Sequence, residues 1–236
     1  MTTADVFAAA LGHLETSSAE PALLPDRLAR ACVAALPRVD GAGLSYTFTA
    51  DRRLPVGASD PVAAAAERLQ FALGEGPCLT AQRQHRLVRA ALPELQGSWP
   101  VYAGQLVTGT PFRGVVAVPV GGPLGGVAGI DLYVRSPDAV TTLSADDVQT
   151  VADLVGAALA DDLATADDRL AGTPSWLTGP SAEAREKVWI AVGYLAGQRA
   201  CTTSDALALL RAHAFTHDLD LERAAELVLA GELPTG

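Results

Sequence analysis

Apolar residues recur along the first part of this chain with two spacings, one typical of helices and one typical of strands. Residues 4–16 repeat apolar side chains at helical intervals, and a second helix is predicted over 25–36. Residues 43–49 alternate apolar and polar side chains as a half-buried strand does, and 54–58 is the predicted partner strand. An alanine-rich helix is predicted to begin at Pro61.

The clearest strand signal comes from two apolar runs, 112–120 and 127–134, on either side of a glycine-rich turn. They predict an antiparallel hairpin at the centre of a sheet. A short strand is predicted over 87–91 and a helix over 98–106. Because helices and strands are mixed without a regular βαβ period, we expect an α+β domain whose antiparallel sheet is flanked by helices.

A long helix is predicted over residues 144–170, with Ser144 as its N-cap and Asp147 as the capping partner. Its apolar positions form a stripe near heptad spacing, where a partner helix is expected to pack: Val148, Val151, Val155, Ala158, Leu159 and Ala166. We therefore expect a connecting helix that also makes a dimer. Residues 171–180 contain two glycines and two prolines and predict a linker.

Residues 181–236 contain no strand signal and predict three short helices. The second is expected to begin at Thr202 with Asp205 as capping partner, and the third after Asp220. The predicted organisation is an α+β domain (1–143), a connecting helix (144–170), a linker (171–180) and a three-helix bundle (181–236).

The charge of the chain limits its partners. The formal net charge is -10 and the sequence pI is about 4.7, which argues against general binding to nucleic acid or to an anionic membrane. Any contact with RNA must be local. The three cysteines form no CxxC pair and no signal peptide is evident, so free thiols in the cytoplasm are expected. The longest uncharged stretches are interrupted by glycine and predict no membrane span.

Three ordered blocks in the C-terminal part resemble the ANTAR family. They are Ile190-Ala-Val-Gly-Tyr-Leu-Ala, then Thr202-Thr-Ser-Asp-Ala-Leu-Ala-Leu-Leu-Arg-Ala-His-Ala-Phe, then Leu221-Glu-Arg-Ala-Ala-Glu-Leu-Val. Residues 20–165 resemble a GAF domain of the kind found before ANTAR in actinobacteria-type regulators. That resemblance depends on Leu73-Gly-Glu-Gly-Pro-Cys-Leu-Thr-Ala, supported by Gly41-Ala-Gly-Leu-Ser and Arg113-Gly-Val-Val-Ala-Val-Pro-Val.

The resemblance implies an RNA-binding transcription antitermination regulator. A GAF-like domain would sense a small molecule or a protein partner, and an ANTAR-like domain would bind a hairpin in a nascent transcript. The chain departs from the family at Ile190 and at the acidic segment 218–220. Residues 171–236 hold five basic and eight acidic residues, a balance of -3. A sensor and protein-interaction module that has lost RNA binding therefore remains the alternative.

The candidate RNA-binding residues follow from this interpretation: Lys187, Ala191, Gly193, Tyr194, Arg211 and Phe215. The basic side chains would contact phosphate and the aromatic rings would stack on unpaired bases. Each has a structural alternative. The aromatic rings would belong to the bundle core, the basic groups would be solvated, and the two small residues would allow close helix packing.

The candidate sensor-pocket residues are Tyr46, Glu75, Cys78, Trp99 and Tyr102. The rings either line a pocket or belong to the core, and Glu75 either faces the pocket or flanks a turn. Cys78 follows Gly76-Pro77 at a predicted helix start, where the helix dipole would lower the pKa of a sensing thiol. The alternative for Cys78 is simple packing.

No catalytic motif and no cofactor motif was found, so we do not expect an enzyme. The glycines at 121–126 lack the lysine and helix of a phosphate-binding loop. His213 and His217 have the i, i+4 spacing of a metal pair, but no third ligand accompanies them, so no metal is expected. A GAF-type thiol reductase using Cys78 is a third hypothesis.

Overall fold

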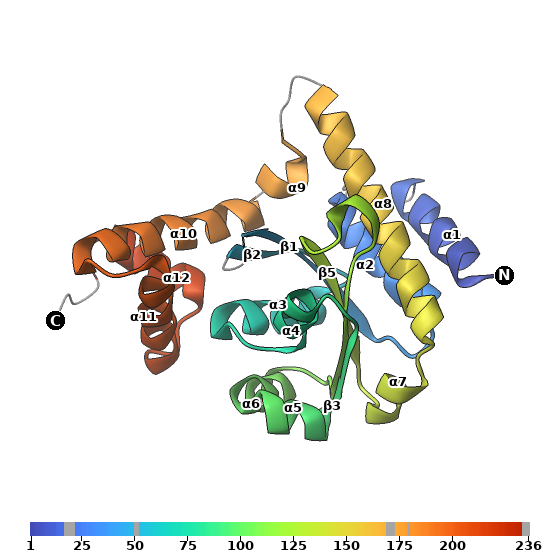
Figure 1. The fold of residues 1–236 in the computed structure, drawn as a ribbon, viewed down its shortest axis with the longest axis horizontal. Helices are drawn as coiled ribbons and strands as arrows, with labels where there is room; N and C mark the ends of the chain where they lie inside the picture. Colours follow the sequence, from blue (N-terminus) through green and yellow to red (C-terminus); the bar gives the residue numbers. More distant parts are fainter. Residues whose placement is uncertain (17–21, 50–51, 169–172, 179, 233–236) are drawn as a thin grey trace. The chain divides into compact units, whose positions relative to one another are not determined.

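The computed structural model describes residues 1–16, 22–49, 52–168, 173–178 and 180–232 (Figure 1). Contacts between residues divide the chain into two compact units, Met1–Leu177 and Thr178–Gly236. The division falls within the segment 171–180 that was predicted to be a linker. The predicted end of the long helix at residue 170 lies outside the described residues.

The first unit is built around one sheet of five strands in the order β2-β1-β5-β4-β3, and every neighbouring pair is antiparallel. The strands are β1 (Gly41–Thr49), β2 (Arg52–Ala58), β3 (Val88–Ala91), β4 (Gly114–Pro119) and β5 (Ala128–Val134). The predicted hairpin of β4 and β5 is confirmed, and β5 is the central strand. The prediction of an α+β fold with an antiparallel sheet is therefore confirmed.

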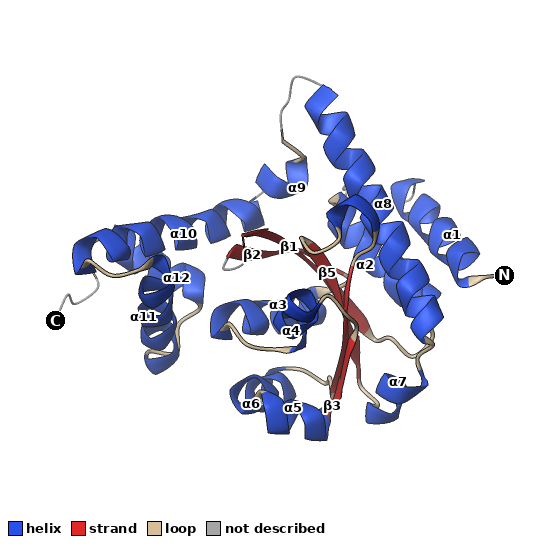
Figure 2. Cartoon of the chain, in the orientation of Figure 1, coloured by secondary structure: helices blue, strands red, loops and turns tan. Residues whose placement is uncertain are grey.

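Helices cover both faces of this sheet (Figure 2). One face is covered by α3 (Pro61–Leu73) and α4 (Pro77–Gln84), with α5 (Leu92–Ser98) and α6 (Pro100–Gly109) beside them. On the opposite face α2 (Leu24–Ala35) and α8 (Ala145–Asp168) contact the sheet, and α1 (Thr3–Thr16) packs on both of these helices. Three short elements complete the fold within the described residues: η1 (Gly122–Leu124), α7 (Pro137–Thr142) and α9 (Ser175–Thr178).

The prediction that a partner helix packs on the apolar stripe of the long helix is wrong. Val148, Val151, Val155 and Leu159 are buried within the chain itself, because this face of α8 contacts β4, β5, α1 and α2. The apolar stripe therefore completes the core of the first unit and is not free to receive a partner helix. A dimer would need another surface.

Capping residues mark where several helices begin. Asp60 accepts hydrogen bonds from the backbone of Val62 and Ala63 ahead of α3, and the Ser144 hydroxyl accepts one from Asp147 N ahead of α8. The start of α4 was predicted at Gly76-Pro77. Three short helices, α5, α7 and α9, were not assigned from the sequence, because each is too short to establish an apolar period.

The second unit consists of α10 (Pro180–Arg199), α11 (Thr203–Thr216) and α12 (Leu221–Leu229) within its described residues. The predicted capping box of Thr202 and Asp205 is present, and Asp220 caps α12. Its core is formed mainly by the apolar residues that face inward from the three helices: Val188, Ala191, Val192, Leu207, Leu210, Leu221, Ala225 and Val228. No helix in the described part of either unit is long and apolar enough to cross a membrane.

Candidate functional site

Strand alternation gives the two faces of the sheet different chemistry. Ser45 lies on the face covered by α3 and α4, where its hydroxyl is 3.5 Å from the Cys78 sulfur. The next residue, Tyr46, lies on the opposite face, and its ring meets Trp176 edge-on at 6.0 Å between centroids. We call the first of these the polar face and the second the apolar face.

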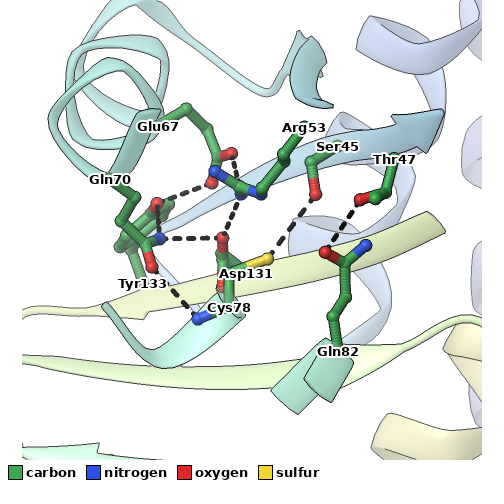
Figure 3. Close-up of polar contacts among 9 residues, drawn as sticks. All are labelled: Ser45, Thr47, Arg53, Glu67, Gln70, Cys78, Gln82, Asp131 and Tyr133. Atoms are coloured by element: carbon green, nitrogen blue, oxygen red, sulfur yellow. Dashed lines mark hydrogen bonds and ion pairs between the residues drawn. The ribbon is translucent and has the colours of Figure 1, made fainter. Parts of the chain in front are cut away.

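The polar face carries a buried ion cluster (Figure 3). A single guanidinium nitrogen of Arg53, Nη2, lies 2.9 Å from Glu67 Oε2 and 3.1 Å from Asp131 Oδ2. All three residues are at most 4% exposed. One cation thus faces two carboxylates in the interior of the unit, where charges interact strongly.

Neutral groups extend this cluster on both sides. The Gln70 amide donates to Asp131 Oδ2 at 2.9 Å, and the Tyr133 hydroxyl donates to Glu67 Oε1 at 2.6 Å. The other end of Gln70 accepts a hydrogen bond from the backbone N–H of Cys78 at 3.0 Å. The cluster therefore joins α3, the start of α4 and strands β2 and β5 in one network (Figure 3).

Two glycines make room for this network. A Cβ atom at Gly43 would overlap the Glu67 side chain, and one at Gly76 would overlap the Gln70 amide. Gly76 also has a φ of 139°, which disfavours other residues. Both glycines fall in or beside the two N-terminal motifs that carry the GAF resemblance, so those motifs contribute to the packing of the ion cluster.

Several buried polar atoms of this face have no hydrogen-bond partner within the described residues. They are Arg53 Nε and Nη1, Gln82 Nε2, Asp131 Oδ1 and the Tyr102 hydroxyl. Buried donors and acceptors are almost always paired in native proteins, with water or ligand where protein groups do not suffice.

Burial controls the ionisation of the cluster. Burial and the nearby Glu67 carboxylate raise the pKa of Asp131 well above its usual range, although Arg53 opposes this. Burial alone would lower the pKa of Arg53, but the acidic groups of Cys78, Glu67 and Asp131 outweigh it and raise that pKa. Burial also raises the pKa of Tyr102 and of Tyr133. The guanidinium therefore stays charged.

The expected low pKa of Cys78 is wrong. Cys78 does stand at the start of α4, but it is 1% exposed, and burial raises the pKa of its thiol far above the usual value. Desolvation of the thiolate outweighs the helix dipole and the nearby Arg53. This thiol is protonated and packed, which disfavours both redox sensing and thiol chemistry.

The other predicted sensor residues lie at different places in the first unit. Tyr102 is buried beside the network, and Trp99 is half-buried and packs against the core on the same face. Glu75 is half-buried and accepts a hydrogen bond from Tyr102 N at 2.9 Å, so it stabilises the first turn of α6. Tyr46 lies on the apolar face, away from the others.

The residues that form the network centre were not predicted from the sequence: Arg53, Glu67, Gln70, Asp131 and Tyr133. One signal was present. Asp131 interrupts the otherwise apolar run 127–134, and a charged residue in a central strand needs a buried partner. The partner itself lies 78 positions away in the sequence and only the fold brings it there.

In the second unit, two of the predicted RNA-binding residues share one exposed face of α10. Lys187 and Tyr194 are both exposed, and the 187 to 194 spacing is two helical turns. Ile190 lies between them on the same face and is 54% exposed. We call these three residues the α10 face. Gly193 is exposed as well, but it lies about 100° around the helix from Tyr194.

The remaining predicted RNA-binding residues have different surroundings. Ala191 is fully buried, so its methyl group packs in the bundle and offers no surface to a ligand. Phe215 is 59% exposed on α11 and so is not part of the core. Arg211 is half-buried on the same helix, one turn earlier.

Acidic side chains accompany the basic groups of this unit. Glu226 lies 4.0 Å from the Lys187 amine and 3.0 Å from Arg223. Glu222 lies 4.0 Å from Arg185. The pairs of Glu226 are exposed and weak, whereas that of Arg185 and Glu222 is largely buried. All three lower the positive potential that phosphate would meet.

Metal binding finds no support in the described part of the chain, which contains no group of three or more His, Cys, Asp or Glu side chains placed to hold an ion. The His213 and His217 rings stack at 4.0 Å. The pKa of His213 is lowered, mainly by desolvation and to a smaller extent by the neighbouring His217.

A scan of the chain against protein-family models finds no match, and a search of curated proteins finds none either.

Proposed function

We propose that this chain is a regulator with a GAF-type sensor in its first unit and an ANTAR-type RNA-binding output in its second. The sensor would bind a small molecule or a partner, and the output would bind a hairpin in a nascent transcript. The proposal draws on the motifs in 41–45, 73–81, 190–196, 202–215 and 221–228.

The observation that carries the RNA proposal is the α10 face. Tyr194 is 48% exposed although a small bundle gains stability by burying its aromatic rings. An exposed aromatic ring on the same helix face as a lysine is suited to stack on an unpaired base while the amine contacts phosphate. Single-stranded loops of RNA hairpins present such bases.

RNA binding by the full chain tests this proposal. Hairpins crosslinked to the chain in its own cells would be sequenced, and their affinity measured by fluorescence anisotropy. We expect Tyr194→Ala to weaken binding by about tenfold or more. Lys187→Ala should weaken it and lower the dependence of log K on log salt by about one unit. The control is Leu229→Ala, which removes an exposed apolar side chain of α12.

The proposed output is wrong if no hairpin binds at low salt, or if Leu229→Ala weakens binding as much as Tyr194→Ala. An equal loss would show that RNA binds the bundle non-specifically and not through the α10 face.

The ion pairs of Lys187, Arg185 and Arg223 favour a second candidate, a protein-interaction module without RNA. Here Ile190 and Tyr194 would contact another protein. This candidate predicts that a purified partner remains bound after nuclease treatment and is released by Tyr194→Ala. Tyr194→Ala weakens binding under both hypotheses. Nuclease treatment distinguishes them, because only the protein complex survives it.

A further inference from the structure

A buried tryptophan anchors the end of the first unit to its own sheet and long helix. Trp176 belongs to α9, within the segment predicted to be a linker, and is only 2% exposed. Its indole N–H donates to Asp162 Oδ2 of α8 at 2.9 Å, and its ring meets the Tyr46 ring of β1 edge-on. We call these three residues the clasp. The first unit ends at Leu177, so the clasp fixes where the chain leaves it.

The clasp is small enough to open without unfolding the unit. The helix α9 has four residues, and Trp176 is its one buried side chain. A helix this short depends on its side-chain contacts, and elements with few buried contacts open at a lower free energy than the core. Opening would move the attachment of the second unit back to α8, which ends at Asp168.

Residues 45–47 of β1 contact both faces of the sheet. On the polar face, the Thr47 hydroxyl donates to Gln82 Oε1 at 2.8 Å, and the Ser45 hydroxyl lies 3.5 Å from the Cys78 sulfur (Figure 3). Both partners belong to α4. The tyrosine between them points to the apolar face and contacts α9. This short segment therefore connects α4 with the clasp through the sheet.

The pairing of this segment with β2 is irregular. The register between β1 and β2 shifts between Leu44 and Ser45, and again between Thr47 and Thr49. Such irregularities disrupt the hydrogen-bond ladder locally and change the direction of side chains, and they are common next to functional sites. Because β2 is an edge strand, its pairing holds residues 45–47 less firmly than a regular ladder would.

We propose that the clasp transmits the state of the first unit to the second. A shift of α4 against β1 moves Tyr46, weakens its contact with Trp176 and releases α9 from α8. The second unit is then attached at α8 by a longer segment, and its reach increases. This inference rests on the proposed division into a sensor and an output, and it specifies how the first acts on the second.

Limited digestion of the full chain with chymotrypsin tests the clasp. This protease accepts large apolar side chains from an extended backbone, so a cut after Trp176 or Leu177 requires α9 to open. Asp162→Ala removes the acceptor of the indole N–H and should raise the rate of this cut about tenfold, because the rate follows the open population. The control Asp161→Ala changes an exposed aspartate of the same helix and should leave the rate unchanged.

A variant on the opposite face tests the connection through β1. Thr47→Val removes the hydroxyl that donates to Gln82 but keeps the side-chain shape, and should raise the rate of the same cut about threefold. Its control is Thr108→Val, an exposed change in α6 that should have no effect. Cutting after Tyr133 in the central strand, measured in the same digest by mass spectrometry, reports global unfolding and should not rise.

Two results of the digestion would overturn the inference. If Asp162→Ala is cut no faster than Asp161→Ala, Trp176 is not released by loss of its acceptor. If Asp162→Ala is cut faster but Thr47→Val is not, the clasp is a fixed anchor that does not respond to α4.

RNA anisotropy on the same variants separates this inference from the proposed output. A different affinity of Asp162→Ala and Asp161→Ala for a hairpin supports control of the output by the clasp, and equal affinities despite faster cutting overturn that control. If no hairpin binds the wild-type chain, the output is wrong, and the cutting rates still decide whether the clasp opens.

Discussion

The two faces of one sheet are built on opposite principles. On the apolar face, Leu44 and Ile130 lie opposite each other in register on β1 and β5, with Leu132 two residues further along β5, and all three are buried beneath α2 and α8. On the polar face, the same two strands place Ser45 and Asp131 beneath α3 and α4. The apolar face stabilises the unit by removing hydrocarbon from water.

The polar face gains less from burial, because every charge it contains must be desolvated and paired. It nevertheless keeps two carboxylates and a guanidinium where apolar side chains would fit a core as well. A local departure from the rule that cores are apolar is expected where function requires it. The proposed sensor function is therefore best tested on the polar face.

The largest expected effect comes from removing the cation of the polar face. Arg53→Met should lower the free energy of unfolding by about 3–5 kcal/mol at pH 7, because it leaves two buried carboxylates without a counter-charge. The loss should shrink at lower pH, where Asp131, whose pKa is raised by burial, takes up a proton. Urea unfolding at pH 5 and pH 7 measures this.

The control for that variant is Arg135→Met. Arg135 is exposed and its ion pair with Asp40 spans 3.7 Å at the surface, so its loss should be close to neutral. A destabilisation by Arg53→Met that does not change with pH would contradict the electrostatic account.

A slightly smaller loss is expected on the apolar face. Leu132→Ala removes a fully buried side chain and should cost about 2–5 kcal/mol through lost burial and the cavity left behind. No ionisable group contributes to this loss, so it should be the same at pH 5 and pH 7 by urea unfolding. A strong pH dependence here would break the distinction between the two faces.

A third variant should stabilise the chain. The folded-state pKa of Asp131 is raised above the unfolded value of 3.8, so its stabilising contribution is complete below that value and is lost as pH rises through the folded pKa. Asp131→Asn removes this dependence while keeping the side-chain shape. Its advantage over the wild type should grow by up to ~1.4 kcal/mol per pH unit across that window.

Urea unfolding from pH 4 to pH 8 measures that slope. Asp138→Asn, an exposed change in α7, serves as control and should leave the slope of the wild type intact. If Asp131→Asn loses stability relative to the wild type as pH rises, Asp131 carries its charge in the folded state.

The smallest expected effect concerns the thiols. Cys78 on the polar face and Cys32 in α2 behind the apolar face are both buried, and burial raises both pKa values. Labelling of the folded chain with a thiol reagent at pH 8 should therefore modify Cys201 alone, which is partly exposed. Cys78→Ser should not change the number of labelled thiols; a drop of one would show that the polar face admits the reagent.

Much of the fold was predictable from local patterns. The strands at 114–119 and 128–134 lie within the predicted runs, and the caps at Ser144, Thr202 and Asp220 begin helices as expected. The site was less predictable. Of the predicted sensor residues, Cys78 and Tyr102 lie on the polar face, but Tyr46 lies on the other face, because neighbours in a strand point to opposite sides.

Short-range signals such as capping residues, apolar periods and turn glycines act over a few positions, and so the sequence by itself determined the elements, the α+β class and the helical nature of the C-terminal unit. The tertiary structure alone decided which face of the sheet holds charge and that the α8 stripe is covered by its own chain. Arg53, Glu67 and Asp131 meet across separations of 14 and 78 residues. Their protonation depends on desolvation, which only the assembled fold imposes.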